Sequence, residues 1–162
     1  KKEFTMASDM FIKIGSIKGE SKDNVHADEI DVLSWDWGMS QSGSMHVGGG
    51  GGAGRVSVQD LVIVKNVDRA SPTLMAHCAS GEHIPEVVLT VRKAGKTALE
   101  YLRITLQRAI VSNVTVGGSG DLSETVTLNF AEYKVEYTPQ KEDGSGEAAV
   151  ETGFNIEKNI AV

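Results

Sequence analysis

Four histidines and one cysteine are the side chains that could bind a metal or form a nucleophile–base pair: His26, His46, His77, Cys78 and His83. Structural metal sites use short spacings such as C-x-x-C or H-x-x-x-H, and the chain contains neither. His77 and Cys78 are adjacent, so on a helix they would point about 100° apart, which disfavours a Cys–His pair. We therefore expect no bound metal, histidines in loops and at a helix end, and Cys78 as a small core residue.

Paired carboxylates could act as general acid and base. The adjacent pairs Asp28/Glu29 and Glu142/Asp143 lie in predicted loops, where acidic groups are usually solvated. The G-x-S-x-G motif of serine hydrolases is absent. No set of residues brings together a nucleophile, a base and stabilising donors. The sequence therefore predicts a binding or structural protein, without enzymatic activity and without a cofactor.

A glycine-rich stretch is the most unusual feature, because seven of the 18 glycines lie within residues 43–54. Its spacings include G-x-G-x-x-G, but a phosphate-binding loop also needs a helix after it and usually a Lys-Ser/Thr pair. Here a predicted strand follows at Arg55, so nucleotide binding is not expected. A loop over residues 42–53 is near the length at which loops are usually functional. Because glycine is costly to order, we expect a partner to order this loop.

Two tryptophans, Trp35 and Trp37, alternate within residues 30–38 and would share one face of a strand with Leu33. A nucleic-acid-binding surface would place lysine or arginine between such rings. Ser34 and Asp36 lie between and beside them instead, and the formal net charge is −6. The tryptophans are therefore expected in a core or an interface, and binding of nucleic acid is not expected.

The elements that must position these residues are mostly strands, because β-branched and aromatic residues alternate with polar ones over several stretches. The predicted strands cover residues 11–17, 30–38, 55–65, 87–92, 99–116 and 125–137. The apolar face changes within 55–65 and within 125–137. A change of face inside a long strand indicates a bulge or a strand shared between two sheets.

One helix is predicted between strands. Ser71 is a suitable N-cap, Pro72 suits the first helical position, and Gly81 suits the C-terminal cap. Leu74 and Cys78 are four residues apart, which gives a short apolar stripe. No alternation of strands and helices suggests a parallel sheet. The predicted fold is thus mainly β, an antiparallel two-sheet β-barrel with one short α-helix on its side.

Length and composition fit one globular domain, with 162 residues, 40% hydrophobic and 23% charged. Residues 1–5, Lys1 to Thr5, precede Met6 and are typical of vector-derived residues, so the domain is expected to span residues 6–162. No apolar run is long enough for a membrane span, and no apolar secretory segment is found. The single cysteine excludes an internal disulfide and suits a reducing cytoplasm.

Several stretches, taken in order, resemble one known family. They are MFIKIGSIK at 10–18, GES at 19–21, HADEIDVLSWDWG at 26–38, MSQSGSMHVGGGGGAG at 39–54, SPTLMAHCASG at 71–81, KAGKTALEYL at 93–102, TVTLNFAEYKVEYTPQK at 125–141 and GFN at 153–155. This ordered set is similar to the haemolysin-coregulated protein (Hcp) family. The resemblance covers residues 6–162, nearly the whole chain.

The resemblance implies a structural role. Members of this family form hexameric rings that stack into the inner tube of the bacterial type VI secretion system, inside a contractile sheath and behind a spike. The rings also carry small effector proteins in their lumen. The implied location is the cytoplasm before firing and the exterior afterwards, by a route without a signal peptide. A phage or phage-like tail-tube protein is the alternative, since it would share the barrel, the ring and the stacking.

Two groups of residues receive roles from this resemblance. Ser34 and Asp36 are candidates for contact with effectors in the lumen. The candidate ring-stacking loop consists of Gln41, Ser42, Gly43, Ser44, Met45, His46, Val47, Gly48, Gly49, Gly50, Gly51 and Gly52.

Overall fold

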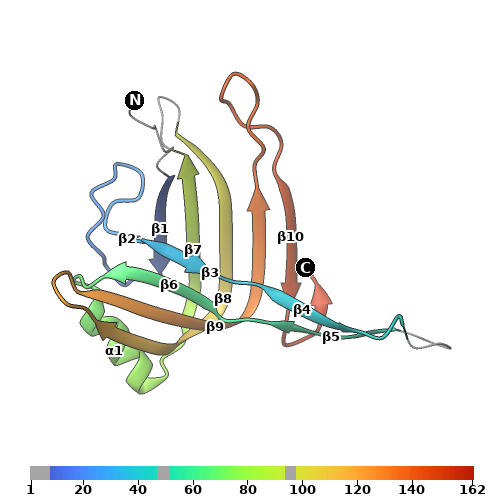
Figure 1. The fold of residues 1–162 in the computed structure, drawn as a ribbon, viewed down its shortest axis with the longest axis horizontal. Coiled ribbons are helices and arrows are strands. Elements are labelled where there is room, and N and C mark those ends of the chain that lie inside the picture. Colours follow the sequence, from blue (N-terminus) through green and yellow to red (C-terminus); the bar gives the residue numbers. More distant parts are fainter. Residues whose placement is uncertain (1–7, 47–51, 94–97) are drawn as a thin grey trace.

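The structure is a computed structural model that describes residues 8–46, 52–93 and 98–162. This part of the chain holds eleven strands and one helix (Figure 1). In chain order they are β1 (Ser8–Ile14), β2 (Ile30–Asp31), β3 (Ser34–Asp36), β4 (Met39–Gly43), β5 (Ala53–Val58), β6 (Leu61–Asn66), α1 (Ser71–Ser80), β7 (Ile84–Lys93), β8 (Leu99–Gly117), β9 (Ser123–Tyr137), β10 (Val150–Asn155) and β11 (Ile160–Ala161). The prediction about residues 1–5 lies outside the described residues.

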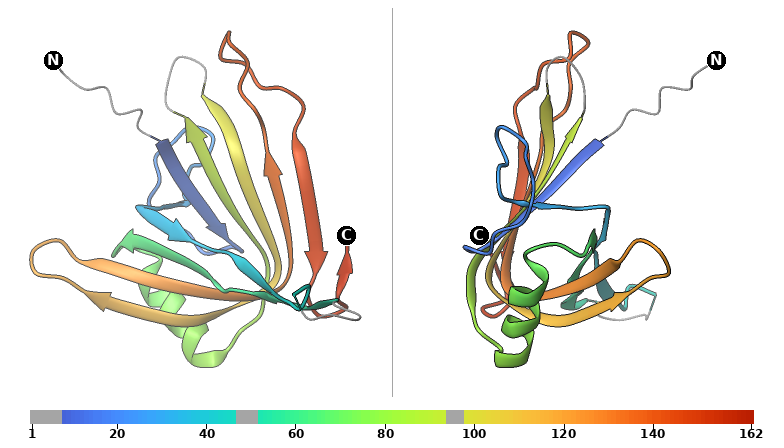
Figure 2. Two further views of the ribbon diagram at one scale, coloured as in Figure 1. Left: turned by 45° about the vertical axis from the view of Figure 1, so that its right-hand side comes forward. Right: turned by 90° about the vertical axis from the view of Figure 1, so that its left-hand side faces the viewer.

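Nine of the strands form one antiparallel sheet in the order β11-β10-β9-β8-β7-β1-β2, with β6 pairing β9 and β3 pairing β6. In Figure 1, β1, β7 and β10 run roughly across the direction of β3 and β6. Figure 2 shows the hairpin end of β8 and β9 turning away from those upright strands, so that the sheet folds over into two layers. β4 and β5 form a separate two-stranded sheet. The prediction of a mainly β, antiparallel fold with one short helix is confirmed.

The corner between the layers lies within the two longest strands. In β8, Leu106 and then Ala109 point into the core, and Arg108 between them has a φ of 53°, in the left-handed region. In β9, the inward residues change in the same way from Phe130 to Tyr133. The first part of β9 pairs with β6 and the last part with β10. The predicted change of face in this strand is confirmed, and its cause is a strand shared between two layers.

The two layers are not joined into a closed barrel in the part of the chain that the structure describes. β2 pairs with β1, and β3 pairs with β6, so the chain leaves one layer and enters the other between these short strands. Two backbone hydrogen bonds hold the crossing point, from Val32 N–H to Met10 O at 3.0 Å and from Leu33 N–H to Val64 O at 2.8 Å. On this side of the fold, the two layers are thus connected by the crossing segment at Val32 and Leu33 and not by one continuous strand.

This crossing corrects the prediction of a single alternating strand over residues 30–38. In β2 the inward residue is Ile30, whereas from β3 onward Trp35 and Trp37 pack against the core. Leu33, which simple alternation places on the tryptophan face, is 51% exposed. The change of pairing partner inverts the inward face.

Residues 55–65 also form two strands where one was predicted. β5 belongs to the two-stranded sheet and β6 to the nine-stranded sheet, with Gln59 and Asp60 between them. Asp60 Oδ1 accepts a hydrogen bond from Asn129 Nδ2 at 2.8 Å, which fixes this break against β9. The change in apolar pattern at Leu61 therefore marks a change of sheet.

The helix α1 packs against β8, with Leu74 fully buried at 0% exposure. Its N-cap is Ala70, one residue before the predicted Ser71. The Ser71 hydroxyl accepts a hydrogen bond from the Asp68 N–H at 3.0 Å, so it stabilises the turn before the helix. Gly81 ends the helix with a φ of 67°, as its predicted role as a cap requires.

Candidate assembly and lumen surfaces

The β4–β5 hairpin projects beyond the nine-stranded sheet (Figure 1). All five residues of β4 are exposed. Ser44 Oγ donates to Gly52 O at 3.0 Å and lies 3.1 Å from the Gly52 nitrogen, whose N–H it accepts. This pair joins the two arms within the predicted ring-stacking loop, three residues after its start at Gln41 and at its end at Gly52.

The structure divides that predicted loop. Gln41 to Gly43 lie in β4, so the predicted irregular loop starts later than residue 42. Met45, at 82% exposure, and His46 lie in the turn beyond β4 and are exposed. Residues 47–51 of the prediction lie outside the described residues.

The base of the hairpin is fixed to the core by Trp37. Its Nε1 donates to Gln59 O at 2.8 Å, and its ring meets Tyr133 edge-on at 4.9 Å between centroids. On the other arm, Arg55 donates to Ile156 O at 3.1 Å. The prediction that the tryptophans lie in a core is confirmed, since both pack against it. Trp37 thereby anchors the hairpin at its base, while every residue of β4 remains exposed.

Ser34 and Asp36 lie on β3, opposite Val64 and Val62 of β6, and both are exposed. Their orientation away from the tryptophans agrees with the prediction. They lie on the nine-stranded sheet, whereas Gln41 to Gly43 of the predicted stacking loop lie on the two-stranded sheet. The described residues of the two predicted groups therefore begin on consecutive strands that belong to different sheets.

Sequence reasoning missed a buried ion cluster at the start of α1. Lys65 is 0% exposed, and its Nζ lies 2.9 Å from Asp68 Oδ1, 3.2 Å from Glu124 Oε1 and 3.2 Å from Ser71 Oγ. One signal was present: Leu61 and Ile63 point inward in β6, so alternation also points Lys65 inward. The cluster ties β6, β9 and the helix together, and it is a structural element.

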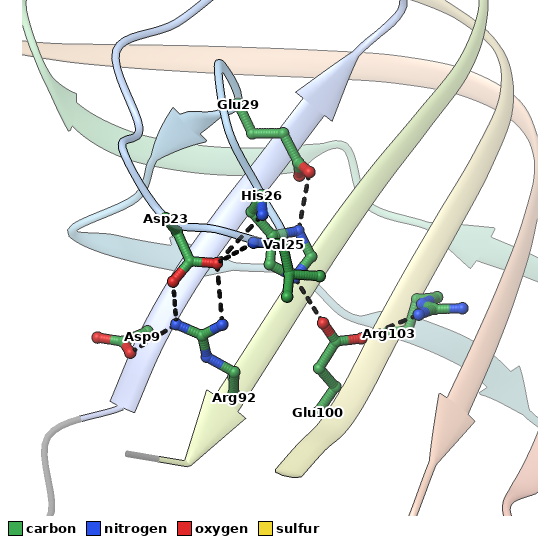
Figure 3. Close-up of polar contacts among 8 residues, drawn as sticks. All are labelled: Asp9, Asp23, Val25, His26, Glu29, Arg92, Glu100 and Arg103. Atoms are coloured by element: carbon green, nitrogen blue, oxygen red, sulfur yellow. Dashed lines mark hydrogen bonds and ion pairs between the residues drawn. The ribbon is translucent and has the colours of Figure 1, made fainter. Parts of the chain in front are cut away.

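A second polar cluster holds the segment between β1 and β2, residues 15–29, over the neighbouring ends of β1, β7 and β8 (Figure 3). Arg92 of β7 donates from Nη2 to Asp23 Oδ1 at 2.6 Å and to Asp9 Oδ2 at 3.1 Å. His26 of the same segment lies between Glu29, 2.8 Å away, and Glu100 of β8, 2.5 Å away. Glu29, predicted to be a solvated charge, is a partner of a buried histidine.

Other chemistry is limited in the described part of the chain. Within residues 8–46, 52–93 and 98–162, no group of three or more His, Cys, Asp or Glu side chains is arranged to hold a metal ion. His77 lies on α1 with its Nδ1 2.9 Å from Thr73 O, and Cys78 is half-buried against the core. In the same residues, no helix has the length and apolar character that crossing a membrane requires.

The fold and the projecting hairpin define a small, two-layered antiparallel β-protein with a single helix packed on one side. A family model described as "Type VI secretion system effector, Hcp" matches residues 11–137. The chain therefore belongs to the Hcp family of the type VI secretion system, and the resemblance found in the sequence is confirmed.

Individual relatives agree along nearly the whole chain. Protein hcp1 of Pseudomonas aeruginosa is 59% identical over 160 residues, which cover 96% of this chain and 99% of that protein. Hcp1 from Salmonella typhimurium has a crystal structure with a TM-score of 0.81 and 42% identity, covering 97% of this chain and 100% of that one. A type VI secretion system effector from Yersinia pestis has a TM-score of 0.75 and 33% identity, covering 91% of this chain and 99% of that one.

Proposed function

We propose that six copies of the chain form a closed ring, and that these rings stack into the inner tube of a type VI secretion system. The single observation that carries the proposal is the match to the Hcp family over residues 11–137. A closed ring of identical subunits uses heterologous contacts, so each subunit presents two different faces to its neighbours. The partners in this proposal are a contractile sheath, a spike and small effector proteins.

The β4–β5 hairpin supports the stacking part of the proposal. A two-stranded hairpin alone is marginally stable in water, and this one buries no residue of β4 in the single chain. A second ring would supply the surface that the hairpin lacks. We propose that residues 41–52 extend from one ring to the next.

The test of stacking is Met45→Glu, which places a charge on the exposed turn of the hairpin. The ring should persist at its native mass, while electron microscopy at high protein concentration should show fewer stacked rings. Met75→Glu is the matched control, because Met75 is also an exposed methionine but lies on α1. Unchanged stacking in Met45→Glu, or equal loss in both variants, would count against a stacking role for the hairpin.

The lumen part of the proposal rests on β3. Ser34 and Asp36 are exposed on the strand that precedes the hairpin, and their neighbours Trp35 and Trp37 fix the strand against the core. A rigid strand can present these two side chains to a passenger protein without changing shape. We propose that Asp36 contacts effectors within the ring.

Asp36→Arg tests that role by reversing the charge. We expect rings of unchanged mass that retain less of a co-expressed effector from the same secretion system, measured by co-purification. The control is Asp121→Arg, an equal change in an exposed loop. Retention equal to that of the unmodified protein in Asp36→Arg would remove Asp36 from the lumen contact.

The proposal contains no catalytic step and no cofactor. The chain would assemble in the cytoplasm and leave the cell with the tube, by a route that needs no signal peptide. The family match favours this function over the alternative of a phage tail tube. Fractionation of the producing bacterium tests the export: we expect the chain in the medium when the secretion system is intact, and inside the cells when its sheath is deleted.

A further inference from the structure

We propose that His26 is a proton-dependent latch, which holds residues 15–29 over the ends of β1, β7 and β8 when the imidazole is protonated and releases part of them when it is neutral. The latch is intrinsic to the single chain and goes beyond the proposed function in ring assembly. Its basis is the placement of one buried histidine between two carboxylates from distant parts of the sequence (Figure 3).

Both ring nitrogens of His26 face a carboxylate. Nδ1 lies 2.8 Å from Glu29 Oε2, and Nε2 lies 2.5 Å from Glu100 Oε1. A neutral imidazole has one N–H donor and one lone pair, so it can donate to only one of these carboxylates. The imidazolium donates to both. The observed arrangement is therefore complete only in the protonated form.

The surroundings leave few other ways to satisfy the ring. His26 is 7% exposed and stacks on Phe11 of β1, with centroids 4.6 Å apart and planes 13° from parallel. If the ring became neutral in place, the lone pair of one nitrogen would face a carboxylate oxygen with little water to separate them. Movement of the segment toward solvent relieves that repulsion.

Charged groups from several neighbouring elements surround His26. Within its own segment, His26 has Glu29 and also Asp23, whose Oδ2 accepts the His26 backbone N–H at 3.1 Å. From β8 comes Glu100, which Arg103 also contacts at 3.0 Å. Arg92 lies on β7 and Asp9 lies on β1. The Arg92 guanidinium pairs with the carboxylates of both Asp9 and Asp23.

The balance of these groups favours the protonated ring. Burial lowers the pKa of His26, but the hydrogen bonds to Glu100 and Glu29 outweigh it and raise the pKa above the usual 6.5. A pKa raised by folding means that the contribution to stability is complete below 6.5 and is lost as the pH rises through the raised pKa. The latch therefore opens on the alkaline side.

The second link of the segment does not titrate in that range. Arg92 holds the pKa of Asp23 well below its usual value, so this ion pair is present at neutral and alkaline pH. Loss of the His26 link then frees the part of the segment near Glu29 and Glu100, while Asp23 stays attached to β7. The expected event is a local opening and not global unfolding.

Hydrogen–deuterium exchange of the intact protein tests this latch. Protection of residues 24–29, corrected for the intrinsic effect of pH on exchange, should fall as the pH rises above 6.5, while protection of β7 and β8 stays constant. His26→Gln should abolish this dependence. Glu100→Gln keeps a similar shape but removes one charge, so it should move the midpoint to lower pH. His77→Gln, on α1, is the control and should leave the profile unchanged.

Titration of the histidine side chains by NMR, with the His26 signal assigned from His26→Gln, gives a direct second measurement. A midpoint above 6.5 for His26 that falls in Glu100→Gln supports the latch. A midpoint at or below 6.5, or protection of residues 24–29 that is independent of pH in the unmodified protein, would overturn it.

Discussion

The two-layered body of the molecule and the β4–β5 hairpin are both antiparallel β-structures, but they are stabilised by different means. In the body, β6 alternates fully buried Leu61 and Ile63 with half-buried residues. In the hairpin, every residue of β4 is exposed, and the contacts that fix it lie at its base, at Trp37 and Arg55. The body is stabilised by its own core, whereas β4 of the hairpin remains exposed in the single chain, as the proposed contact with a second ring requires.

This difference separates stability from assembly within one small chain. Changes in the body should lower the free energy of unfolding, and changes in the hairpin should leave it nearly unchanged while altering contacts between rings. Because assembly also raises apparent stability, these comparisons need one fixed protein concentration.

The largest effect is expected from the buried ion cluster. Lys65→Ala leaves Glu124 buried without its counter-charge, which should lower the free energy of unfolding by about 3–5 kcal/mol in chemical denaturation. Replacing both residues, as Lys65→Met with Glu124→Leu, should recover part of that loss, since neither charge then remains buried and unpaired. A loss below about 1 kcal/mol in the single variant would show that the cluster is not a stabilising link.

The next-largest loss of stability is expected from a cavity in the apolar core. Leu128 of β9 is 0% exposed, and Leu128→Ala should cost about 2–5 kcal/mol, because the neighbouring side chains fill the space only partly. The same measurement on Leu122→Ala, an exposed leucine in the turn before β9, provides the matched control. Equal effects in the two variants would contradict the assignment of the core.

Acid stability should depend on Asp23. Since Arg92 lowers the pKa of Asp23, its contribution is complete above the usual pKa of 3.8 and is lost as the pH falls below it. Asp23→Asn should therefore have a lower melting temperature than the unmodified protein at neutral pH. The difference between the two melting temperatures should narrow as the pH falls toward about 2. Thermal unfolding across this range measures the effect, with Asp121→Asn as the control in an exposed loop. A gap independent of pH would refute the linkage.

The smallest effect on stability is expected in the hairpin. Met45→Glu should change the free energy of unfolding by less than about 0.5 kcal/mol, because the side chain is exposed at 82%. The same variant should reduce ring stacking, as described above. A large loss of stability would mean that the hairpin contributes to the core, which would remove the distinction between the two regions.

Much of the body could be predicted from the sequence because alternation is local. The apolar pattern of residues 125–137 predicts both the strand β9 and its change of face. The inversion between Ile30 and Trp35 could not be predicted, since it follows from a change of pairing partner from β1 to β6. The end of β4, Ser42 and Gly43, falls in the loop predicted over residues 42–53, because the glycine content of that stretch outweighed any strand signal.

The polar clusters show the same limit. Residue type makes His26 a candidate metal ligand, but its partner Glu100 lies 74 residues away and only the fold brings the two together. Alternation in β6 points Lys65 inward, yet nothing local identifies Glu124 as its counter-charge. Long-range ion pairs leave no periodic signal in a sequence.

The most direct test of the central claim, that this chain is a ring-forming tube subunit, is native mass spectrometry of the purified protein at low micromolar concentration. We expect a dominant species of six times the 17.3 kDa of one chain. The Met45→Glu variant should also form the sixfold species, because its change lies in the hairpin that is proposed to contact the next ring. A dominant monomer in the unmodified protein would contradict the claim that the chain assembles into rings by itself.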